Sequence, residues 1–280
     1  MIIKKTLAEI EKMAAAGRIL VQTLALLESK VAPGVRTEEL DAAAERFIRS
    51  HGATPTFKGF RGFPGSICAS PNAMVVHGIP GRYQLGEGDI VSIDVGVTLD
   101  GWVADAARTF PVGEIGAVEQ NLLRGTREAL FAGVQQCRAG NRMGDVSHAI
   151  ERVAEGAGLS IVRSLVGHGV GRDMHEDPQV PNYGRPGKGP LLEAGMVLAI
   201  EPMTTAGRPA VRVGGDGWGV FSQDDSPAAH FEFTVAITAA GPRVLTPWHV
   251  REGGEPADPA ARPSANGRAS AAAQPVGGAS

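Results

Sequence analysis

One pattern occurs twice along this chain, first as Leu85-Gly-Glu-Gly-Asp-Ile-Val-Ser-Ile-Asp94 and again as Leu192-Glu-Ala-Gly-Met-Val-Leu-Ala-Ile-Glu201. In both copies a glycine-containing turn precedes an apolar run, typical of a buried strand, and a carboxylate ends the run. A second match lies upstream at one constant offset: Gly34, Arg36, Ala43, Glu45 and Arg46 correspond to Gly140, Arg142, Ala149, Glu151 and Arg152. The repeat predicts two similar halves of one domain, and a site at their junction would receive a carboxylate from each half.

Length and composition limit the class of protein. The 280 residues carry a formal net charge of −3, so nothing in the composition indicates a broad nucleic-acid surface. Charged residues interrupt any signal-peptide core near the N-terminus, and no apolar run approaches the roughly 20 residues of a membrane span. The two cysteines, Cys68 and Cys137, imply no disulfide framework. We therefore expect a cytoplasmic protein without nucleic-acid specificity or a membrane anchor.

The chain divides by composition into a folded part and a tail. Residues 251–280 are mostly Ala, Gly, Pro and Ser, and cannot bury enough apolar surface to offset the entropy of ordering. We predict a disordered tail there and a single domain at 1–250, with halves at about 1–115 and 116–250. Thr6 and Glu9 form a capping-box pattern at the start of the first helix.

A predicted hairpin brings two carboxylates together. Asp100-Gly101 is a strong signal for a two-residue turn between two apolar runs, and this turn would pair Gly96 with Asp105. Paired residues share a face, as do residues two apart on one strand, so Asp94 and Asp105 become diagonal neighbours. Adjacent carboxylates repel each other unless a cation or a proton intervenes. The pair is a candidate metal site, although two solvated aspartates are the simpler interpretation of the pair alone.

The second half holds further candidate ligands. Two histidines stand in the glycine-rich segment Gly167-His-Gly-Val-Gly-Arg-Asp-Met-His175, whose glycines would let other groups approach the His168 imidazole. The segment lacks the spacing of a phosphate-binding loop. Glu201 ends a buried strand, where an isolated carboxylate needs a partner, and Glu232 lies in an alternating stretch. His230 shares a face with Glu232, so an ordinary ion pair between these two is the competing interpretation.

These motifs together resemble the type I methionine aminopeptidases and occur in that family's order. They are His77-Gly-Ile-Pro80, Ile93-Asp94-Val-Gly, Gly167-His-Gly-Val-Gly, Met174-His-Glu, Ile200-Glu-Pro-Met203, Asp216-Gly-Trp218 and Phe231-Glu-Phe. The resemblance covers about residues 1–248. It implies an α/β (α+β) pita-bread fold, in which two pseudo-symmetric halves form a curved antiparallel sheet covered by helices.

The resemblance also implies a set of metal ligands. Five residues match the family's ligands for two divalent ions: Asp94, Asp105, His168, Glu201 and Glu232. Asp105 and Glu232 would bridge the ions, His168 and Glu201 would complete one ion, and Asp94 the other. An oxygen-rich set with one nitrogen suits Mn²⁺, Fe²⁺ or Co²⁺, with Zn²⁺ as a further option, and the sequence does not choose among them. Two such ions activate a water as the nucleophile.

Three further roles follow from the same resemblance. Glu201 would act as the general base, and His175 would donate a hydrogen bond to the carbonyl oxygen of the substrate. His77 would contact the amide nitrogen of the scissile bond. The substrate's free α-amine would bind near the metal held by Asp94, which explains an exopeptidase.

The resemblance places a methionine pocket at five residues: Phe60, Phe63, Cys68, Met174 and Trp218. A soft apolar lining fits an unbranched thioether, although ordinary core packing is the competing interpretation for the aromatic residues. The chain departs from the family's common pattern here, since Phe60 and Phe63 replace tyrosines and Met174 replaces a phenylalanine. Val103-Ala104 also replaces the usual His-Gly before Asp105. The pocket's shape and the rate depend on these changes more than the reaction type does.

The activity that the resemblance implies is removal of the initiator methionine from nascent proteins whose second residue is small. The partners would be nascent polypeptide N-termini near the ribosome, and the protein would act as a monomer. The nearest alternative is an Xaa-Pro aminopeptidase or dipeptidase of the same fold. Those enzymes usually carry an additional N-terminal domain, whereas here the first half-repeat begins almost at once. A non-catalytic binding relative is the other alternative, but such relatives typically lose ligands.

Overall fold

The computed structural model describes residues 1–250. Contacts within the chain define a compact unit, Met1–Pro247, and a second unit, Trp248–Ser280. The tail predicted at 251–280 lies outside the described residues, and the predicted domain limits stay predictions. Among the helices of the described part, none is both long and apolar enough to cross a membrane.

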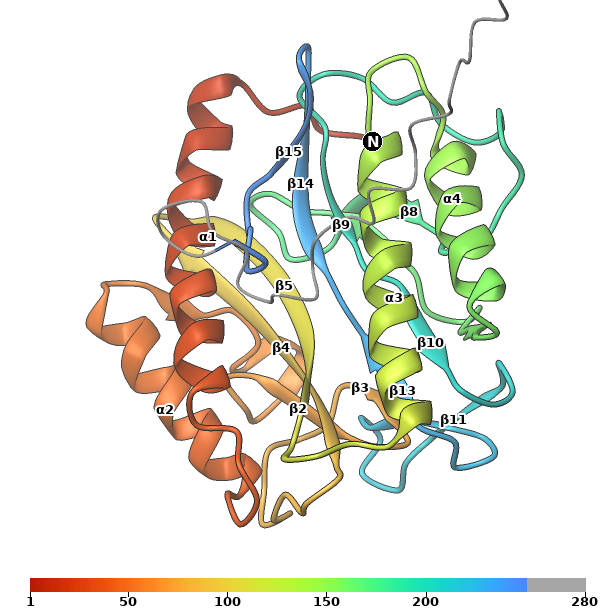
Figure 1. Ribbon diagram of the computed structural model, residues 1–280. Helices are drawn as coiled ribbons and strands as arrows, with labels where there is room; N and C mark the ends of the chain where they lie inside the picture. The colour runs from red at the N-terminus through yellow and green to blue at the C-terminus, as the bar shows by residue number, and fades with distance from the viewer. Residues whose placement is uncertain (251–280) are drawn as a thin grey trace, which may run out of the picture. The chain divides into compact units, whose positions relative to one another are not determined.

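The first half of the compact unit places two helices beside an antiparallel sheet (Figure 1). Helix α1 packs on strands β4 and β5 and contacts α2. Strand β4 is central in its sheet and pairs with β1, β2 and β5. The elements are α1 (Leu7–Glu28), α2 (Thr37–Ser50), β1 (Thr54–Pro55), the 3-10 helix η1 (Phe60–Gly62), β2 (Cys68–Pro71), β3 (Met74–Val76), β4 (Ile90–Leu99) and β5 (Trp102–Pro111).

The second half also begins with two helices, α3 and α4, which lie side by side (Figure 1). Its main antiparallel sheet has the order β15-β14-β9-β7-β8, and a three-stranded sheet has the order β13-β10-β6. A further sheet, β11-β12-β3, joins two strands of this half to β3 of the first half. The elements are α3 (Ala117–Gln136), α4 (Met143–Gly156), β6 (Ser160–Ile161), β7 (Gly167–Gly169), β8 (Glu176–Val180), β9 (Val197–Ile200), β10 (Met203–Thr205), β11 (Val211–Val213), β12 (Val220–Ser222), β13 (Ala228–His230), β14 (Phe233–Thr238) and β15 (Gly241–Val244).

The sequence repeat is also a repeat of local structure. The Gly34 N–H donates to the Leu85 carbonyl at 2.7 Å, and the Gly140 N–H donates to the Leu192 carbonyl at 3.0 Å. Helices α2 and α4 begin alike, because an acid three residues after the N-cap accepts a hydrogen bond from the N-cap backbone. The pairs are Arg36 with Glu39 and Arg142 with Asp145, both at 2.7 Å. The prediction of two pseudo-symmetric halves is confirmed.

Strands β4 and β5 form the predicted hairpin. Asp100 and Gly101 both have positive φ, 51° and 74°, as a tight hairpin turn between right-twisted strands requires. The register pairs Gly96 with Asp105, so Asp94 and Asp105 are diagonal neighbours on one face, as predicted. The turn chemistry alone thus sets the position of two candidate ligands.

Helix α1 begins at the predicted capping box. The Thr6 backbone N–H donates to Glu9 Oε2 at 2.8 Å, and the Glu9 N–H donates to Thr6 Oγ1 at 3.3 Å. One face of the helix, from Ile10 to Leu27, is buried and packs on β4 and β5, whereas Leu7 in the first turn is 74% exposed. The helix therefore covers the back of the hairpin that carries the aspartates.

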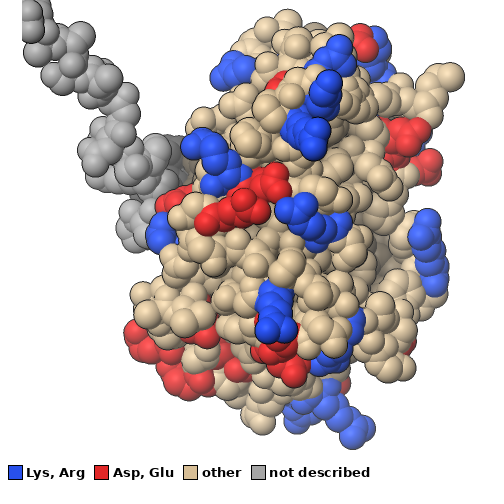
Figure 2. All heavy atoms as spheres, turned by 90° about the vertical axis from the view of Figure 1, so that its right-hand side faces the viewer, with Lys and Arg blue, Asp and Glu red and all other residues tan. Residues whose placement is uncertain are grey.

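Charge is mixed over the surface. Figure 2 shows Lys and Arg side chains interspersed with Asp and Glu on one face, where the described residues form no continuous basic area. Ion pairs at the surface include Lys4 with Glu193 and Arg163 with Glu151, both at 2.9 Å. On this face Lys and Arg do not gather into the basic patch that is typical of a nucleic-acid site.

Candidate metal centre

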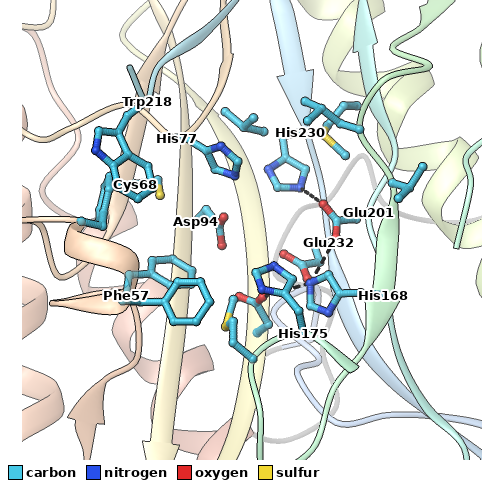
Figure 3. Close-up of a pocket in the computed structure, with 18 of the residues that line it drawn as sticks. Phe57, Cys68, His77, Asp94, His168, His175, Glu201, Trp218, His230 and Glu232 are labelled. Atoms are coloured by element: carbon cyan, nitrogen blue, oxygen red, sulfur yellow. Dashed lines mark ion pairs between the residues drawn. The ribbon is translucent and has the colours of Figure 1, made fainter. Parts of the chain in front are cut away.

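A cavity of about 330 Å³ is lined by residues from both halves (Figure 3). Every residue that the sequence assigns to a metal, catalytic or pocket role lies on its wall. These residues are Phe60, Phe63, Cys68, His77, Asp94, Asp105, His168, Met174, His175, Glu201, Trp218 and Glu232. The fold brings them together, while their individual roles stay predictions.

The carboxylates of the two halves meet where strand β5 of the first half lies against the chain between β13 and β14 of the second half. We call this contact the seam. The Asp105 N–H donates to Thr234 Oγ1 at 2.9 Å, and this hydroxyl donates to the Asp105 carbonyl at 2.7 Å. The Glu232 N–H donates to the Ala107 carbonyl at 2.9 Å. These bonds fix the main chains of Asp105 and Glu232 side by side, so the two acids that the sequence predicts as bridging ligands face one cavity.

His168 is held in the orientation of a metal ligand. It lies on β7, between β8 and β9. Its Nδ1 is 2.8 Å from the Gly169 carbonyl oxygen, which can only accept, so Nδ1 carries the proton and Nε2 keeps its lone pair. Nε2 lies 3.8 Å from Asp105 Oδ2 and 3.5 Å from Glu201 Oε1. A metal-ligating histidine typically donates its other ring N–H in this way.

The glycines around His168 serve a different purpose from the one expected. A Cβ on Gly167 would overlap the Ala199 carbonyl oxygen of β9, and a Cβ on Gly169 would overlap the Asp177 carbonyl oxygen. Both glycines therefore allow neighbouring strands to approach closely, rather than opening the imidazole to other groups. The short strand spacing brings His168 towards Glu201.

Glu201 follows β9 directly and is 9% exposed. Its backbone carbonyl accepts a hydrogen bond from Asn182 Nδ2 at 3.0 Å. Its carboxylate lies between two imidazoles, because Oε1 is 3.5 Å from His168 Nε2 and Oε2 is 3.5 Å from His230 Nε2 (Figure 3). The isolated acid at the strand end thus has partners, as its burial requires.

The donor set fits a divalent cation. One ligand atom from each of Asp105, His168 and Glu232 lies within 4.8 Å of the others, and all three residues are buried. Asp94 Oδ1 and Asp105 Oδ1 are buried without a hydrogen-bond partner. Unsatisfied carboxylate oxygens beside a neutral imidazole are costly in a folded protein, and a bound cation would satisfy them.

Electrostatics support the same conclusion. Burial raises the pKa of Asp94 to about 7 and that of Glu201 to about 8. Burial, followed by the neighbouring carboxylates, raises the pKa of Asp105 and of Glu232 well above the usual range. Burial lowers the pKa of His168 to about 4, which keeps the ring neutral. In the absence of a cation these acids would hold protons, and a divalent cation would release them.

The remaining cavity wall is apolar and aromatic. Phe63, Cys68 and Met174 are buried, and Phe63 packs edge-on against Trp218 with ring centroids 5.1 Å apart. Cys68 pairs in register with Asp94, which places the apolar wall directly beside the carboxylates. Both features agree with the predicted pocket.

His175 and His77 stand nearer the cavity mouth. The His175 ring lies 4.3 Å from that of His168 and 5.5 Å from that of Phe60, measured between centroids. His77 has a φ of 60°, an uncommon conformation for a residue with a side chain. Such backbone strain often marks functional positions, because the surrounding structure must hold it.

The structure adds residues that the sequence did not single out. The cavity is also lined by Phe57, Arg61, Val76, Ser164, Leu165, Val166, Met203 and His230. A Cβ on Gly96 would lie 2.7 Å from Phe57 Cε1, so the Phe57 ring fills the space beside the hairpin. The sequence holds no signal for Phe57. For His230, the alternation with Glu232 indicates the correct face of the strand. It gives no sign that the ring lies beside Glu201.

Buried carboxylates and a neutral imidazole around one cavity define the class of metal-dependent hydrolases. The chain belongs to metallopeptidase family M24, whose family model matches residues 11–239. It is a metal-dependent peptidase of that family. The resemblance to type I methionine aminopeptidases is confirmed by the following similarities.

The chain is similar to proteins named methionine aminopeptidase in both sequence and structure. It is 54% identical to that of Clostridium perfringens and 51% identical to methionine aminopeptidase 1 of Bacillus subtilis, each covering 88% of this chain and 99% of the relative. The crystal structure of the Thermotoga maritima methionine aminopeptidase matches with a TM-score of 0.87 at 43% identity, covering 88% of this chain and 99% of that one. The predicted fold is confirmed.

A more distant structure shares the fold alone. The prolidase of Pyrococcus furiosus matches with a TM-score of 0.71 at 24% identity, and the match covers 87% of this chain and 65% of that one. The same architecture therefore accommodates different peptidases, and the choice among activities depends on the cavity.

Proposed function

We propose that this chain is a methionine aminopeptidase that removes the N-terminal methionine of nascent polypeptides whose second residue is small. One observation carries the proposal: the carboxylate cluster opens directly onto an apolar cavity of about 330 Å³. Phe63, Cys68 and Trp218 form a wall suited to a flexible thioether, and Asp94 lies beside it. An apolar side chain seated there would bring its own α-amine and carbonyl to the acids.

Two divalent ions would be held by the buried acids and the neutral imidazole that line the cavity: Asp94, Asp105, His168, Glu201 and Glu232. When bound, the ions supply Lewis-acid chemistry, which polarises the substrate carbonyl and makes water more acidic. Mn²⁺, Fe²⁺, Co²⁺ and Zn²⁺ all accept such a mixed carboxylate and imidazole set.

The chain's own side chains supply the other steps. Glu201 accepts the proton of the attacking water, and its place between two imidazoles keeps the carboxylate in the cavity. His175 donates a hydrogen bond to the carbonyl oxygen as negative charge develops there. His77 orients the scissile amide nitrogen, and Asp94 lies where the free α-amine would bind.

We propose that the partners are nascent N-termini at the ribosome, and that the protein acts in the cytoplasm as a monomer. Cys68 and Cys137 are both free and buried, which suits a reducing compartment.

A substrate comparison tests the proposal. The purified full chain, reconstituted with Mn²⁺ or Co²⁺, is assayed on Met-Gly-Xaa, Met-Leu-Xaa and Xaa-Pro peptides with separation of the products. We expect release of free methionine from Met-Gly-Xaa and little cleavage of the other two. Preferred cleavage of Xaa-Pro peptides would instead support the prolidase-like alternative.

Metal removal is the matching control for that assay. We expect exhaustive chelation to abolish methionine release, and added Mn²⁺, Fe²⁺ or Co²⁺ to restore it, because the buried acids need a cation to act together. Full activity in a sample verified as metal-free by elemental analysis would contradict the two-metal mechanism.

A further inference from the structure

His230 is a buried histidine of the cavity that none of the predicted roles uses. The residue is 2% exposed, and neither Nδ1 nor Nε2 has a hydrogen-bond partner. Its nearest ion-pair contact is with Glu201, where Nε2 lies 3.5 Å from Oε2. Figure 3 shows the ring beside His77, directed towards Glu201. A buried polar ring without hydrogen bonds is uncommon, and calls for an explanation in a cavity where reactions occur.

The backbone of His230 is fixed more firmly than its ring. Thr109 Oγ1 accepts from the His230 N–H at 2.9 Å and donates to the His230 carbonyl at 2.9 Å. The Ser92 hydroxyl lies 2.8 Å from the same Thr109 oxygen. On the other side, His230 pairs in register with Met203 of β10. These contacts fix the main chain of His230, and the imidazole lines the cavity. The two ring nitrogens are the groups of this residue that lack hydrogen bonds.

A comparison with His168 shows which role the ring can take. Nδ1 of His168 donates to a carbonyl, which fixes Nε2 as a lone-pair donor for a cation. His230 has no such anchor on Nδ1, and it lies outside the group of ligand atoms formed by Asp105, His168 and Glu232. Its tautomer is therefore free to place the proton on Nε2, facing the Glu201 carboxylate.

The two imidazoles lie on opposite oxygens of one carboxylate. Glu201 Oε1 is 3.5 Å from His168 Nε2, and Oε2 is 3.5 Å from His230 Nε2. The Glu201 main chain is held by Asn182, so rotation of the side chain is the freedom that remains. A donor on Oε2 would stop that rotation and leave Oε1 directed at the cation.

We propose that His230 is a positioning residue, whose Nε2–H holds Oε2 of Glu201 so that the carboxylate stays aligned to accept the proton of the attacking water. This role rests on the proposed function and deepens it. A side chain that keeps an N–H donor at this place, such as glutamine, would preserve the alignment. An apolar side chain of similar size would fill the same space, but the Glu201 carboxylate would lose its alignment.

The kinetic test compares His230→Leu with His230→Gln in the full chain, on Met-Gly-Xaa peptide at saturating metal. We expect kcat of His230→Leu to fall by about 10- to 100-fold, the usual effect of losing a group that orients a ligand residue. KM should stay within about twofold, because the substrate contacts are unchanged. His230→Gln should recover most of kcat. Equal losses in both variants, or an unchanged kcat in His230→Leu, would overturn the proposal.

Two controls separate positioning from folding and from metal binding. Ile150→Ala removes a buried side chain from α4 and lowers stability without touching the cavity, so it should lower Tm but not kcat below its Tm. Calorimetric titration with Mn²⁺ should show a loss of affinity of up to about 10- to 100-fold in His230→Leu, because His230 orients the ligand residue Glu201, and recovery in His230→Gln, which keeps an N–H donor. A loss in His230→Gln as large as that in His230→Leu would show that the imidazole itself is a metal ligand and refute the positioning role.

One readout does not depend on peptidase activity. Nitrogen NMR of histidine-labelled, metal-free protein reports which ring nitrogen carries the proton. We expect His230 to be protonated on Nε2, and its Nε2 resonance to move in Glu201→Gln. Protonation on Nδ1 would overturn the proposal. If these signals behave as expected while methionyl peptides are not cleaved, the proposed function fails and the His230–Glu201 contact stands.

Discussion

Glu201 is the residue at which ligand and base chemistry would coincide. Its carboxylate is buried, flanked by His168 and His230, and attached to a main chain that Asn182 fixes. Burial raises its pKa to about 8, so the acid can exchange a proton near neutral pH once a cation lowers that value. In the proposed function, this single side chain would determine whether water can be activated.

Replacement of that carboxylate tests its role directly. In Glu201→Gln the side chain keeps its size but cannot accept a proton, so we expect turnover of Met-Gly-Xaa peptide to fall by about 100- to 10,000-fold. The protein should stay folded, because glutamine fits the same space. Peptide cleavage and circular dichroism are measured on one metal-replete sample. Activity like that of the natural protein would disprove the assignment.

The buried acids also predict how metal-free protein responds to pH. Burial raises the pKa of Glu201 from its ordinary 4.5 to about 8, so the folded state keeps a proton that the unfolded chain has released. The stability linked to that proton is present at low pH and is lost as the pH rises towards about 8. Burial lowers the pKa of the cavity histidines, and above about pH 7.5 they are largely neutral in both states, so the carboxyls dominate there.

We therefore expect the Tm of chelated protein to fall between about pH 7.5 and pH 8.5. Saturating Mn²⁺ should remove this fall, because the cation binds the ionised carboxylates. Differential scanning calorimetry at several pH values, with and without the ion, measures both effects. A Tm of metal-free protein that rises with pH in this window would contradict the role of the buried acids.

At the scale of elements, the segment between β7 and β8 carries His175 and is held by a buried ion pair. Lys5 Nζ lies 2.6 Å from Glu176 Oε2, with only 3% and 6% of the two side chains exposed. Glu176 Oε1 also accepts from the Arg172 N–H at 3.0 Å. The residues before α1 therefore hold the segment that presents His175 to the cavity.

Loss of the lysine should loosen that segment. Lys5→Met leaves the Glu176 carboxylate buried without its counter-charge, which typically costs about 3–5 kcal/mol of unfolding free energy. Urea unfolding measures the change, and KM for Met-Gly-Xaa should rise because His175 moves. The matched control is Lys4→Met, which breaks the exposed pair with Glu193 and should cost at most about 1 kcal/mol. Equal effects of both variants would show that burial of the pair does not matter.

At the scale of the whole molecule, the site exists only where the two halves meet. Thr234 of β14 makes two hydrogen bonds with the main chain of Asp105, at 2.9 and 2.7 Å. Glu232 is joined to Ala107 two residues further along the same seam. The seam thus holds Asp105 and Glu232, one acid from each half, with a ligand atom of each within 4.8 Å of the other.

Removal of the threonine hydroxyl should weaken the seam and the site together. We expect Thr234→Val to lose about 1–3 kcal/mol of stability, because the Asp105 N–H and carbonyl stay buried without partners. Mn²⁺ affinity should drop by about 10-fold as Asp105 shifts. Thr238→Val is the control, since its hydroxyl bonds Gly241 within one half, and it should leave Mn²⁺ affinity unchanged. Calorimetric titration of both variants decides the matter.

Much of the fold follows from local rules that the sequence shows. The Asp100-Gly101 turn and the two-residue period of a strand place Asp94 and Asp105 on one face before any tertiary contact is known. The repeated turns and helix starts predict two similar halves, because each is stabilised by hydrogen bonds between residues of its own half. The apolar run before Glu201 likewise predicts this residue at the end of a strand, because the run is itself a local signal.

Contacts between elements far apart in the chain could not be predicted this way. Alternation indicates which face carries His230 and Glu232, but only the packing of the strands within the second half places Glu201 beside His230. The Phe57 ring likewise reaches the cavity through a close approach at Gly96 that leaves no periodic signal. Sequence periodicity fixes which face a side chain occupies. Tertiary packing alone fixes which faces meet, because that depends on the complementary shapes and hydrogen bonds of residues far apart in the chain.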